Sequence, residues 1–333
     1  MPDVEKSERE RREAALKCWF LTGATCSGKT NAAVVLAERA DAEIISLDSM
    51  AIYRGMDLGT AKPPAAVRQR VPHHLIDIRD PHEEFSVSQY CELAHEAIEQ
   101  IHGRGKRVLF VGGTPLYLKS LLRGLFRGPA ADWEFRESIE TELRELNIGE
   151  LRKRLQQVDP LSAHKLHPND KRRMIRALEV YHLTGEPISH QQTQFEEGTA
   201  AEDCNVFVMK WPREKLHERI NRRVNEMFEK GFENEVRGLL ERYGQLSHTA
   251  AQAVGYAEVI ALIQRRSDLE TTIETVKTRT RRFARRQETW FRGLSECRWI
   301  NVDESTDQDQ MIEQLIEMAY ATERRMCEKW VAE

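Results

Sequence analysis

The stretch Gly23-Ala24-Thr25-Cys26-Ser27-Gly28-Lys29-Thr30, GATCSGKT, decides the fold of this chain. It satisfies the pattern GxxxxGK[ST] in full, which is typical of a P-loop. A hydrophobic run at residues 18–21 leads into it, and an apolar helical run at residues 32–40 follows it. This order of strand, loop and helix brings backbone amides to a helix N-terminus, where they bind phosphate oxygens. The stretch therefore predicts a site for a di- or triphosphate.

Two residues of the loop have individual roles in this pattern. The lysine reaches the terminal phosphates, and the hydroxyl residue after it ligates Mg²⁺. Lys29 and Thr30 occupy those positions. We therefore expect Mg²⁺ as a cofactor, with Thr30 as a protein ligand. The alternative is a chance turn rich in glycine and serine, which does not account for the apolar runs on both sides.

The first third of the chain alternates strands with helices. Apolar runs predict strands at about 17–22, 43–47, 74–78 and 107–111, and a helix is expected from Ser86 to His102. Such alternation predicts an α/β fold with a parallel sheet flanked by helices, as in P-loop NTPases. Because sites in these sheets lie at the carboxyl ends of the strands, we expect three segments to converge. These are Gly23–Thr30, Asp48–Ser49 and Gly112–Thr114.

The strand signal stops between residues 125 and 204, where apolar periodicity and prolines predict short helices. We interpret this segment as an all-helical insertion. A strand at 205–209 returns the chain to the sheet, and long helices follow. The expected organisation is a disordered tail or frayed helix at 1–16, a core domain at 17–124 and 205–333, and the insertion at 125–204.

The composition excludes several classes of protein. The net charge of −4 argues against a chain that is basic throughout. The six cysteines show no CxxC pair and no metal-ligand spacing, which favours reduced thiols and a cytoplasmic location. No apolar run approaches the roughly 18 residues of a membrane span. We expect a monomer without a membrane anchor.

Asp48 follows a strand of buried type and is a candidate for three roles. Its carboxylate can act as a general base, ligate Mg²⁺, or cap a turn. Against the capping role, a glycine-containing loop rather than a clear helix start follows it. The strand that ends at Gly112-Gly113-Thr114 carries no acid, although P-loop ATPases often hold Mg²⁺ with one there. This disfavours ordinary ATP hydrolysis and makes a diphosphate leaving group worth considering.

Two local basic clusters stand out from the acidic average. Residues 277–292 hold seven basic residues against one acid, with Arg279, Arg282, Arg285 and Arg286 on one helical face. A second cluster, at residues 171–176, opens a helix of the insertion. Charge runs commonly form solvated surfaces, and that reading stays open for each cluster. Together they favour contact with a nucleic-acid backbone.

These motifs together resemble the bacterial tRNA dimethylallyltransferases. The resemblance runs in order from about Trp19 to Arg292 and is carried by several segments rather than one. The segments are GATCSGKT, IISLDSMAIYRGMDLGTAKP, PHHLIDI, GGTPLYLKSLL, HPNDKRRMIRALEVYHLTGEP, RINRRVNEMFEKGFENEV, AVGYAEV and RRFARRQETWFR.

The resemblance implies an activity and roles for individual residues. The dimethylallyl group of dimethylallyl diphosphate would pass to the exocyclic amine of the adenosine just 3′ of the anticodon, within the anticodon stem-loop of a tRNA. Asp48 would take the proton from that amine, Thr114 would lie beside the reacting centre, and Mg²⁺-bound diphosphate would leave. Arg223 is the expected catalytic arginine, and Arg219 joins the residues from Gly23 to Thr30 in binding diphosphate. One of these two arginines could instead pair with Glu226.

The resemblance also implies a set of tRNA contacts. They are Asp48, Ser49, Met50, Ala51, Thr114, Arg136, Arg172, Arg173, Arg176, Gln252, Gly255, Tyr256, Arg281, Arg282, Arg285, Arg286 and Gln287. The chain departs from the family at three positions. Ala24 and Cys26 replace a proline and an alanine, and Ala51 replaces a glutamine, which puts one polar contact to the RNA in doubt. The zinc finger of eukaryotic members has no counterpart here.

Three other functions share parts of this pattern. An adenylate isopentenyltransferase would use the loop, Asp48 and Thr114 but would not need the basic clusters. A small-molecule kinase of the shikimate-kinase type would transfer the γ-phosphate of ATP. A non-catalytic RNA-binding NTPase switch would need no base. A labelled donor distinguishes these functions. The label shows which acceptor is modified, and its position in the donor shows whether the allylic group or a phosphate is transferred.

Overall fold

The computed structural model describes residues 2–124, 128–145, 148–191 and 198–332. The chain divides into two compact units. The first combines residues 1–122 with 198–333, and the second spans 123–197. The predicted insertion limits, 125 and 204, differ from these bounds. Residues 198–204 belong to the first unit, where a short 3₁₀ turn, Ala201–Asp203, precedes the return to the sheet.

Across the described residues, six parallel strands form one sheet in the order β3-β2-β4-β1-β5-β6. This confirms the predicted parallel α/β class. β1 lies near the middle, and every residue from Trp19 to Gly23 is buried. Parallel strands covered on both faces are expected to be this apolar. The strands are β1 Trp19–Gly23, β2 Ala42–Leu47, β3 His73–His74, β4 Arg107–Gly112, β5 Asn205–Lys210 and β6 Cys297–Asn301.

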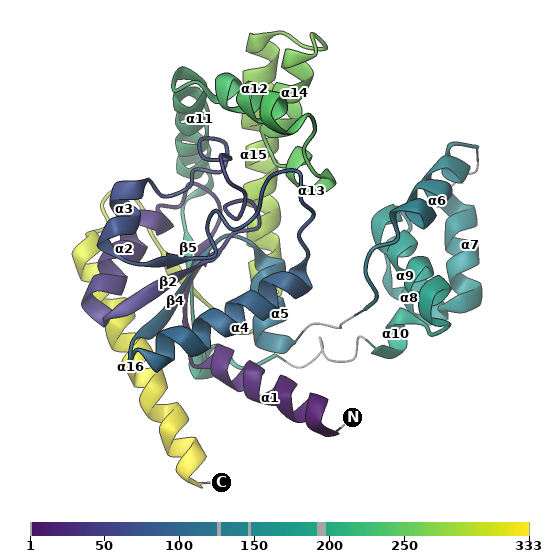
Figure 1. The fold of residues 1–333 in the computed structure, drawn as a ribbon. Helices are drawn as coiled ribbons and strands as arrows, with labels where there is room; N and C mark the ends of the chain where they lie inside the picture. Colours follow the sequence, from purple (N-terminus) through teal and green to yellow (C-terminus); the bar gives the residue numbers. More distant parts are fainter. Residues whose placement is uncertain (1, 125–127, 146–147, 192–197, 333) are drawn as a thin grey trace. The chain divides into compact units, whose positions relative to one another are not determined.

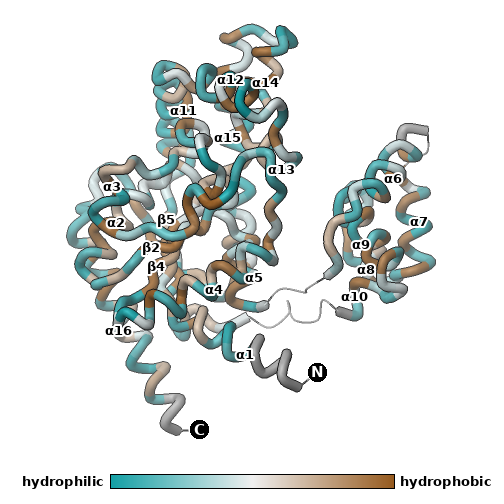
Figure 2. The backbone as a smooth tube through the Cα atoms, viewed as in Figure 1, coloured by the Kyte–Doolittle hydropathy of each residue, from teal (hydrophilic) through white to brown (hydrophobic). Residues whose placement is uncertain are grey.

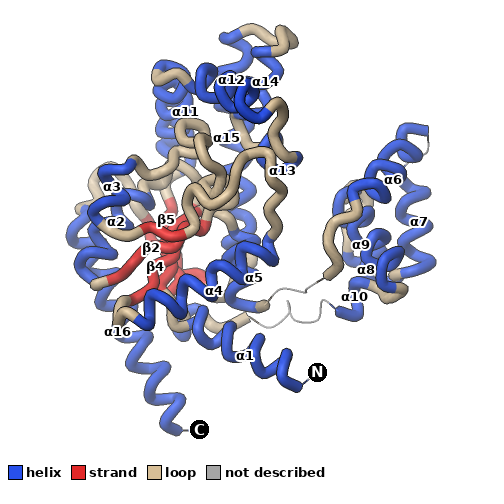
Figure 3. Tube along the Cα trace, viewed as in Figure 1, coloured by secondary structure: helices blue, strands red, loops and turns tan. Residues whose placement is uncertain are grey.

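Helices cover both faces of the sheet, whose strands lie at the centre of the first unit in Figure 3. On one face Phe20 and its neighbours pack against α4 (Val87–Gly103) and α5 (Pro115–Arg123). On the other face Trp19 and Leu21 pack against α2 (Lys29–Ala40) and α16 (Gln308–Ala332). Alternate residues of a strand point to opposite faces, so one short apolar run serves both cores. The brown strand segments of Figure 2 mark this apolar centre.

Five further helices build the part of the first unit around α11 in Figure 1. They are α11 Arg213–Glu229, α12 Phe232–Tyr243, α13 His248–Ala251, α14 Tyr256–Ile263 and α15 Leu269–Arg292. α11 and α15 pack together through an apolar cluster that includes Ile220, Val276 and Ala284. The same cluster contains Ala24 of the P-loop. The loop therefore rests on two helices that lie about 190 or more residues further along the chain.

Two sequence predictions about the first unit are wrong. The N-terminal segment is not a disordered tail, because Pro2–Leu16 forms helix α1. Ala15 is fully buried, and the Arg12 guanidinium donates to the carbonyl of Leu122. The strand expected at 74–78 is limited to β3, because Leu75 and Asp77 have φ values of 59° and 57°, which end an extended strand. The short helix α3, Ala65–Arg70, precedes β3.

The second unit is helical and has its own core. Buried side chains on α7 and α9, Leu151, Leu155, Met174 and Val180 among them, form one apolar cluster. The described helices are α6 Trp133–Glu145, α7 Ile148–Val158, α8 Pro160–Lys165, α9 Lys171–Thr184 and α10 Ile188–Gln191.

In neither unit does a described helix combine the length and the apolar character that crossing a bilayer requires.

Candidate active site

Three loops meet at the carboxyl ends of β2, β4 and β1, which are adjacent in the sheet. The Thr114 amide donates to the carbonyl of Leu47, and its Oγ1 accepts from the Ser49 amide at 3.1 Å. Buried Thr22 Oγ1 donates to the Gly112 carbonyl at 2.8 Å. The predicted convergence of the three segments is confirmed. Thr114 therefore holds the turn that begins at Asp48.

The P-loop presents backbone donors at the start of α2. Gly28 has φ +91°, a conformation that glycine adopts without strain, and the chain enters the helix directly after it. Among the described residues, no acceptor receives the N–H groups of Gly28, Lys29 or Thr30. The first N–H groups of a helix lack partners within the helix, so they are available to an anion.

Lys29 folds back onto its own loop. Its ammonium donates to the carbonyls of Gly23 and Ala24 at 2.9 and 2.7 Å and to Ser27 Oγ at 3.2 Å. Burial lowers the pKa of Lys29 from 10.5 to about 8, although the charge of Asp48 opposes this shift. A bound anion would favour the charged ammonium and raise the pKa again.

We predict from this pKa that diphosphate binding takes up a proton in alkaline solution. Near pH 7 the Lys29 side chain is already protonated in the free protein, so this group takes up no proton when diphosphate binds. Above about pH 8 the free protein has lost that proton, and the bound diphosphate restores it. Affinity for inorganic diphosphate should therefore fall as pH rises through about 8. Calorimetry at about pH 9 in buffers of different ionisation enthalpy measures the uptake.

Lys29→Gln serves as the control, because it removes the titrating group while the ligand's own titration stays the same. Proton uptake at about pH 9 should be smaller for this variant than for the wild type. Equal uptake by both proteins would show that Lys29 is not the group that titrates.

Two arginines of α11, one helical turn apart, contact the loop. Arg223 Nη1 donates to Thr25 Oγ1 at 3.0 Å and lies 3.5 Å from Cys26 Sγ. Arg219 Nε donates to the Cys26 carbonyl at 2.9 Å, and its guanidinium lies 4.2 Å from the centre of the Trp211 ring. Neither arginine pairs with Glu226, whose ion pair is with the neighbouring Arg222 at 3.9 Å. Both guanidinium groups therefore stay beside the phosphate loop.

Asp48 caps the turn after β2 and keeps one oxygen for other chemistry. Its Oδ1 accepts from the backbone amides of Met50 and Ala51 at 2.8 and 3.2 Å. Within the described parts of the chain, no hydrogen bond reaches Oδ2. The capping role and the role of general base are thus compatible, because separate oxygens carry them. The two amide bonds fix the direction of the carboxylate.

A metal site made from protein side chains alone is not present in the described residues, where no three His, Cys, Asp or Glu side chains are grouped to hold a metal ion. Thr30 lies in the first turn of α2, next to the free N–H groups. Mg²⁺ commonly binds through substrate phosphates with few protein ligands. The Thr30 hydroxyl is one possible protein ligand, and the N–H groups beside it suit the phosphate oxygens that would complete the coordination of a magnesium ion.

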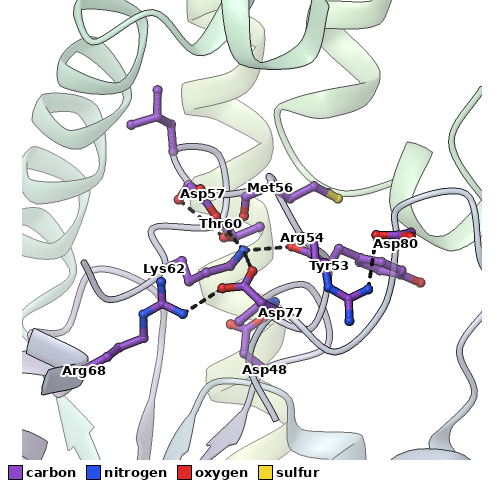
Figure 4. A network of polar contacts seen from close by, with 12 residues as sticks. Asp48, Tyr53, Arg54, Met56, Asp57, Thr60, Lys62, Arg68, Asp77 and Asp80 are labelled. Carbon is purple, nitrogen blue, oxygen red and sulfur yellow. Dashed lines mark hydrogen bonds and ion pairs between the residues drawn. The ribbon is translucent and has the colours of Figure 1, made fainter. Parts of the chain in front are cut away.

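A buried lysine anchors the loop after Asp48 (Figure 4). The Lys62 ammonium donates to the Tyr53 carbonyl at 2.8 Å and to Oδ1 of Asp57 and of Asp77 at 2.6 Å each. Burial acts to raise the pKa of Asp77, but Lys62 and Arg68 lower it overall. Sequence reasoning missed this network. A lysine just before Pro63 looks like a surface residue until its burial is known.

A second anchor holds the same loop. The Glu235 carboxylate accepts from the backbone amides of Asp57, Leu58 and Gly59 at 3.1, 2.7 and 3.3 Å. Tyr256 donates its hydroxyl to the same carboxylate at 2.6 Å, and the residue is fully buried. The Tyr256 side chain therefore supports the loop from within, and its contact with RNA stays a prediction.

Two more residues with predicted RNA contacts, Gly255 and Gln252, lie at and just before the start of α14. Gly255 is buried and donates its amide to Glu258 Oε2 at 2.8 Å, so it starts the helix. Gln252 is exposed on the preceding turn and lies 2.7 Å from the His248 ring. Gln252 is therefore the accessible member of this pair.

The residues with predicted RNA contacts that follow β2 differ in their exposure. Ser49 and Met50 are half-buried, whereas Ala51 is 4% exposed. The Ala51 side chain therefore packs inside, and its carbonyl accepts from the Asp77 amide. The contact of Ala51 with RNA stays a prediction, and its buried methyl group offers no polar atom for it.

The expected basic face of α15 is formed by three of its four arginines, because the fourth, Arg279, is paired with the buried Glu258. Arg282, Arg285 and Arg286 are exposed, and among the described residues no side chain or carbonyl accepts from their guanidinium groups. Arg281 instead donates to Asn221 Oδ1 at 2.6 Å and joins α15 to α11. Gln287 is 4% exposed, so its side chain is enclosed in the protein, and its contact with RNA stays a prediction.

The basic residues of the second unit also fall into two groups, one paired with a buried carboxylate and one exposed. Arg136 binds Glu179 through two bonds of 2.7 and 2.8 Å, and Arg176 binds the same carboxylate at 2.5 Å. Glu179 is fully buried, so these guanidinium groups neutralise a charge in the core of the unit. A glutamate on the apolar face of a predicted helix was the sequence signal for this pairing. Arg172 and Arg173 are exposed at the N-terminus of α9, where the helix dipole disfavours cations.

Comparison with known proteins gives consistent matches. A family model described as IPP transferase matches residues 51–294. A tRNA dimethylallyltransferase of Rhodopirellula baltica is 50% identical over 308 residues, covering 89% of this chain and 92% of the relative. Its counterpart in Geobacter sulfurreducens is 43% identical over 291 residues, covering 87% and 94%.

Solved structures agree with these relatives. A full-length tRNA isopentenylpyrophosphate transferase from Bacillus halodurans has a TM-score of 0.67 and 36% identity, covering 93% of this chain and 99% of that one. A eukaryotic dimethylallyltransferase, captured acting on tRNA, has a TM-score of 0.68 and 28% identity, covering 86% and 74%.

Proposed function

The chain belongs to the IPP transferase family, and from this premise we propose how its site works and which base it modifies. It is a prenyltransferase that moves a dimethylallyl group onto tRNA. We propose that the donor is dimethylallyl diphosphate. The acceptor is the exocyclic amine of the adenosine 3′ to the anticodon, held within the anticodon stem-loop. The convergence of a phosphate loop and the open oxygen of Asp48 carries this proposal.

The first half of the reaction concerns the acceptor. Asp48 Oδ2 takes a proton from the adenine amine as its nitrogen attacks the allylic carbon. Met50 and Ala51 keep the carboxylate oriented through Oδ1, so that Oδ2 faces the incoming base. The adenine must leave its stack to reach a site at the edge of the sheet. Glu235 anchors residues 57–59 of the loop that follows Asp48.

The second half concerns the leaving group. Negative charge grows on the diphosphate as the carbon–oxygen bond breaks, and fixed donors stabilise it. Lys29, Arg223 and the N–H groups of Gly28, Lys29 and Thr30 provide those donors. Arg219 holds the loop through the Cys26 carbonyl. When Mg²⁺ is bound, with Thr30 as its protein ligand, it neutralises part of the diphosphate charge.

The tRNA backbone meets exposed cations. Arg282, Arg285 and Arg286 on α15 support this role, because they project from the core unit without protein partners in the described residues. In the second unit, the exposure of Arg172 and Arg173 supports the same role in binding the tRNA backbone. Binding through several such cations is expected to weaken steeply with salt. We propose that the protein acts as a monomer in the cytoplasm, where its tRNA substrate is found.

The choice of acceptor tests the proposal against its nearest rival, an enzyme that prenylates free adenine nucleotides. Purified protein is incubated with labelled dimethylallyl diphosphate, Mg²⁺, and either unmodified tRNA or AMP. We expect label in the RNA and none in AMP. Equal labelling of both acceptors would overturn the tRNA assignment.

A further inference from the structure

The buried side chain of Gln287 touches both halves of the site. It lies on α15, where Ala284, Gln287 and Phe291 form the buried face at spacings of three and four residues. The Gln287 Oε1 accepts from the backbone amide of Thr25 at 2.9 Å. Its Nε2 donates to the carbonyl of Gly113 at 2.5 Å. One amide group thus links the phosphate loop to the loop after β4.

Each of these two partners is linked to a residue that we propose takes part in the reaction. Thr25 also receives the Arg223 guanidinium through its hydroxyl, so the Gln287 bond holds the residue that locates Arg223. Gly113 precedes Thr114, whose Oγ1 fixes the Ser49 amide beside Asp48. A Cβ at Gly113 would lie 2.5 Å from Gln287 Nε2, so a larger residue there would displace the Gln287 amide.

The opposite side of the same helix carries the RNA-facing cations. Arg286 and Arg285 immediately precede Gln287 and are exposed, whereas Gln287 itself is enclosed. We infer that Gln287 is a positioning residue that links the RNA-binding helix α15 to the phosphate loop and to the loop beside Asp48. This inference rests on the proposed function and adds a residue that acts through Thr25 and Gly113 without touching either substrate.

An amide satisfies both bonds, because it carries an acceptor oxygen and a donor nitrogen. An ionised carboxylate accepts from the Thr25 amide but cannot donate to the Gly113 carbonyl, whereas a protonated carboxyl group can do both. Methionine has a similar length and makes neither bond. Gln287→Glu and Gln287→Met therefore separate the two contacts. Gln310→Met, at an exposed site on α16, is the matched control.

The test measures kcat and KM for prenyl transfer, and the dissociation constants of tRNA and of inorganic diphosphate. For Gln287→Met we expect kcat to fall by about ten- to a hundredfold, the effect of losing two hydrogen bonds. The diphosphate should bind more weakly, and the tRNA should bind as it does to wild type, because the arginines remain. For Gln287→Glu we expect the rate relative to wild type to rise as pH is lowered and the carboxyl group becomes protonated.

Two results would overturn the inference. One is a Gln287→Met protein with wild-type kcat and wild-type diphosphate affinity. The other is loss of tRNA affinity in parallel with kcat, which would indicate a direct RNA contact or general damage to α15. If Gln287→Met does not fold, the pH series of Gln287→Glu decides the matter, and a constant ratio to wild type counts against the inference. Diphosphate binding is measured without RNA, so its outcome is independent of whether the wild type prenylates tRNA.

Discussion

Replacing Asp48 by asparagine lowers the rate of prenyl transfer by about 10²–10⁴-fold, the usual effect of losing a general base. Asparagine keeps an oxygen that can accept from the Met50 and Ala51 amides, so the turn after β2 is preserved. The change replaces Oδ2 by an amide nitrogen, which cannot take a proton from the adenine amine. The loss should appear in kcat, with little change in the affinity for tRNA. Single-turnover kinetics with saturating donor measure it.

Asp48→Ala is the companion variant, because it removes both the base and the cap. The difference in melting temperature between the two variants reports the cap, and the rate that they lose in common reports the base. A near wild-type rate for Asp48→Asn would show that another group accepts the proton. Restoration of Asp48→Asn activity by raising the pH would lead to the same conclusion.

The second large effect is expected at Arg223. Arg223→Ala should lower kcat by about 10²–10³-fold, the effect of removing one fixed donor from a developing negative charge. Its guanidinium bonds Thr25 Oγ1 in the loop and can turn to a phosphate oxygen without moving α11. Arg223→Lys should recover only part of the rate, because an ammonium does not reproduce the paired donors of a guanidinium.

Arg222→Ala provides a matched control for Arg223→Ala. Arg222 is the next residue on the same helix, lies largely exposed and pairs only loosely with Glu226 at 3.9 Å. This variant should keep the wild-type kcat, since an exposed ion pair contributes little to stability. Equal losses of kcat in the two variants would indicate a general electrostatic effect of α11. They would contradict a specific role of Arg223 in the site.

The sequence predicted the features that depend on local pattern. The P-loop signature, the apolar strands and the position of Asp48 at a strand end were enough to predict that three loops would meet. Helix α4 begins after Ser86 as expected, with a capping box between Ser86 and Gln89. These features follow from neighbours in the chain, so they can be recognised in one sequence.

The supporting contacts could not be predicted in this way. Gln287 is 262 residues from Thr25 in sequence, so the local pattern, which places it on a helix face with Ala284 and Phe291, does not identify its partner. Tyr256 and Glu235 likewise act on a loop about 180–200 residues earlier. The family resemblance placed Gln287 and Tyr256 among the RNA contacts, whereas in this structure both side chains are buried and bond to other parts of the protein.

The fate of the two parts of the donor tests the central claim most directly, namely that the P-loop holds a leaving diphosphate. Dimethylallyl diphosphate labelled in the allylic carbon and separately in the β-phosphate is incubated with the protein, Mg²⁺ and unmodified tRNA. We predict that the carbon label appears in the RNA, on the adenosine 3′ to the anticodon, and that the phosphate label appears in free diphosphate in equal amount. Phosphate label in the RNA, or release of diphosphate without carbon label in the RNA, would contradict the account.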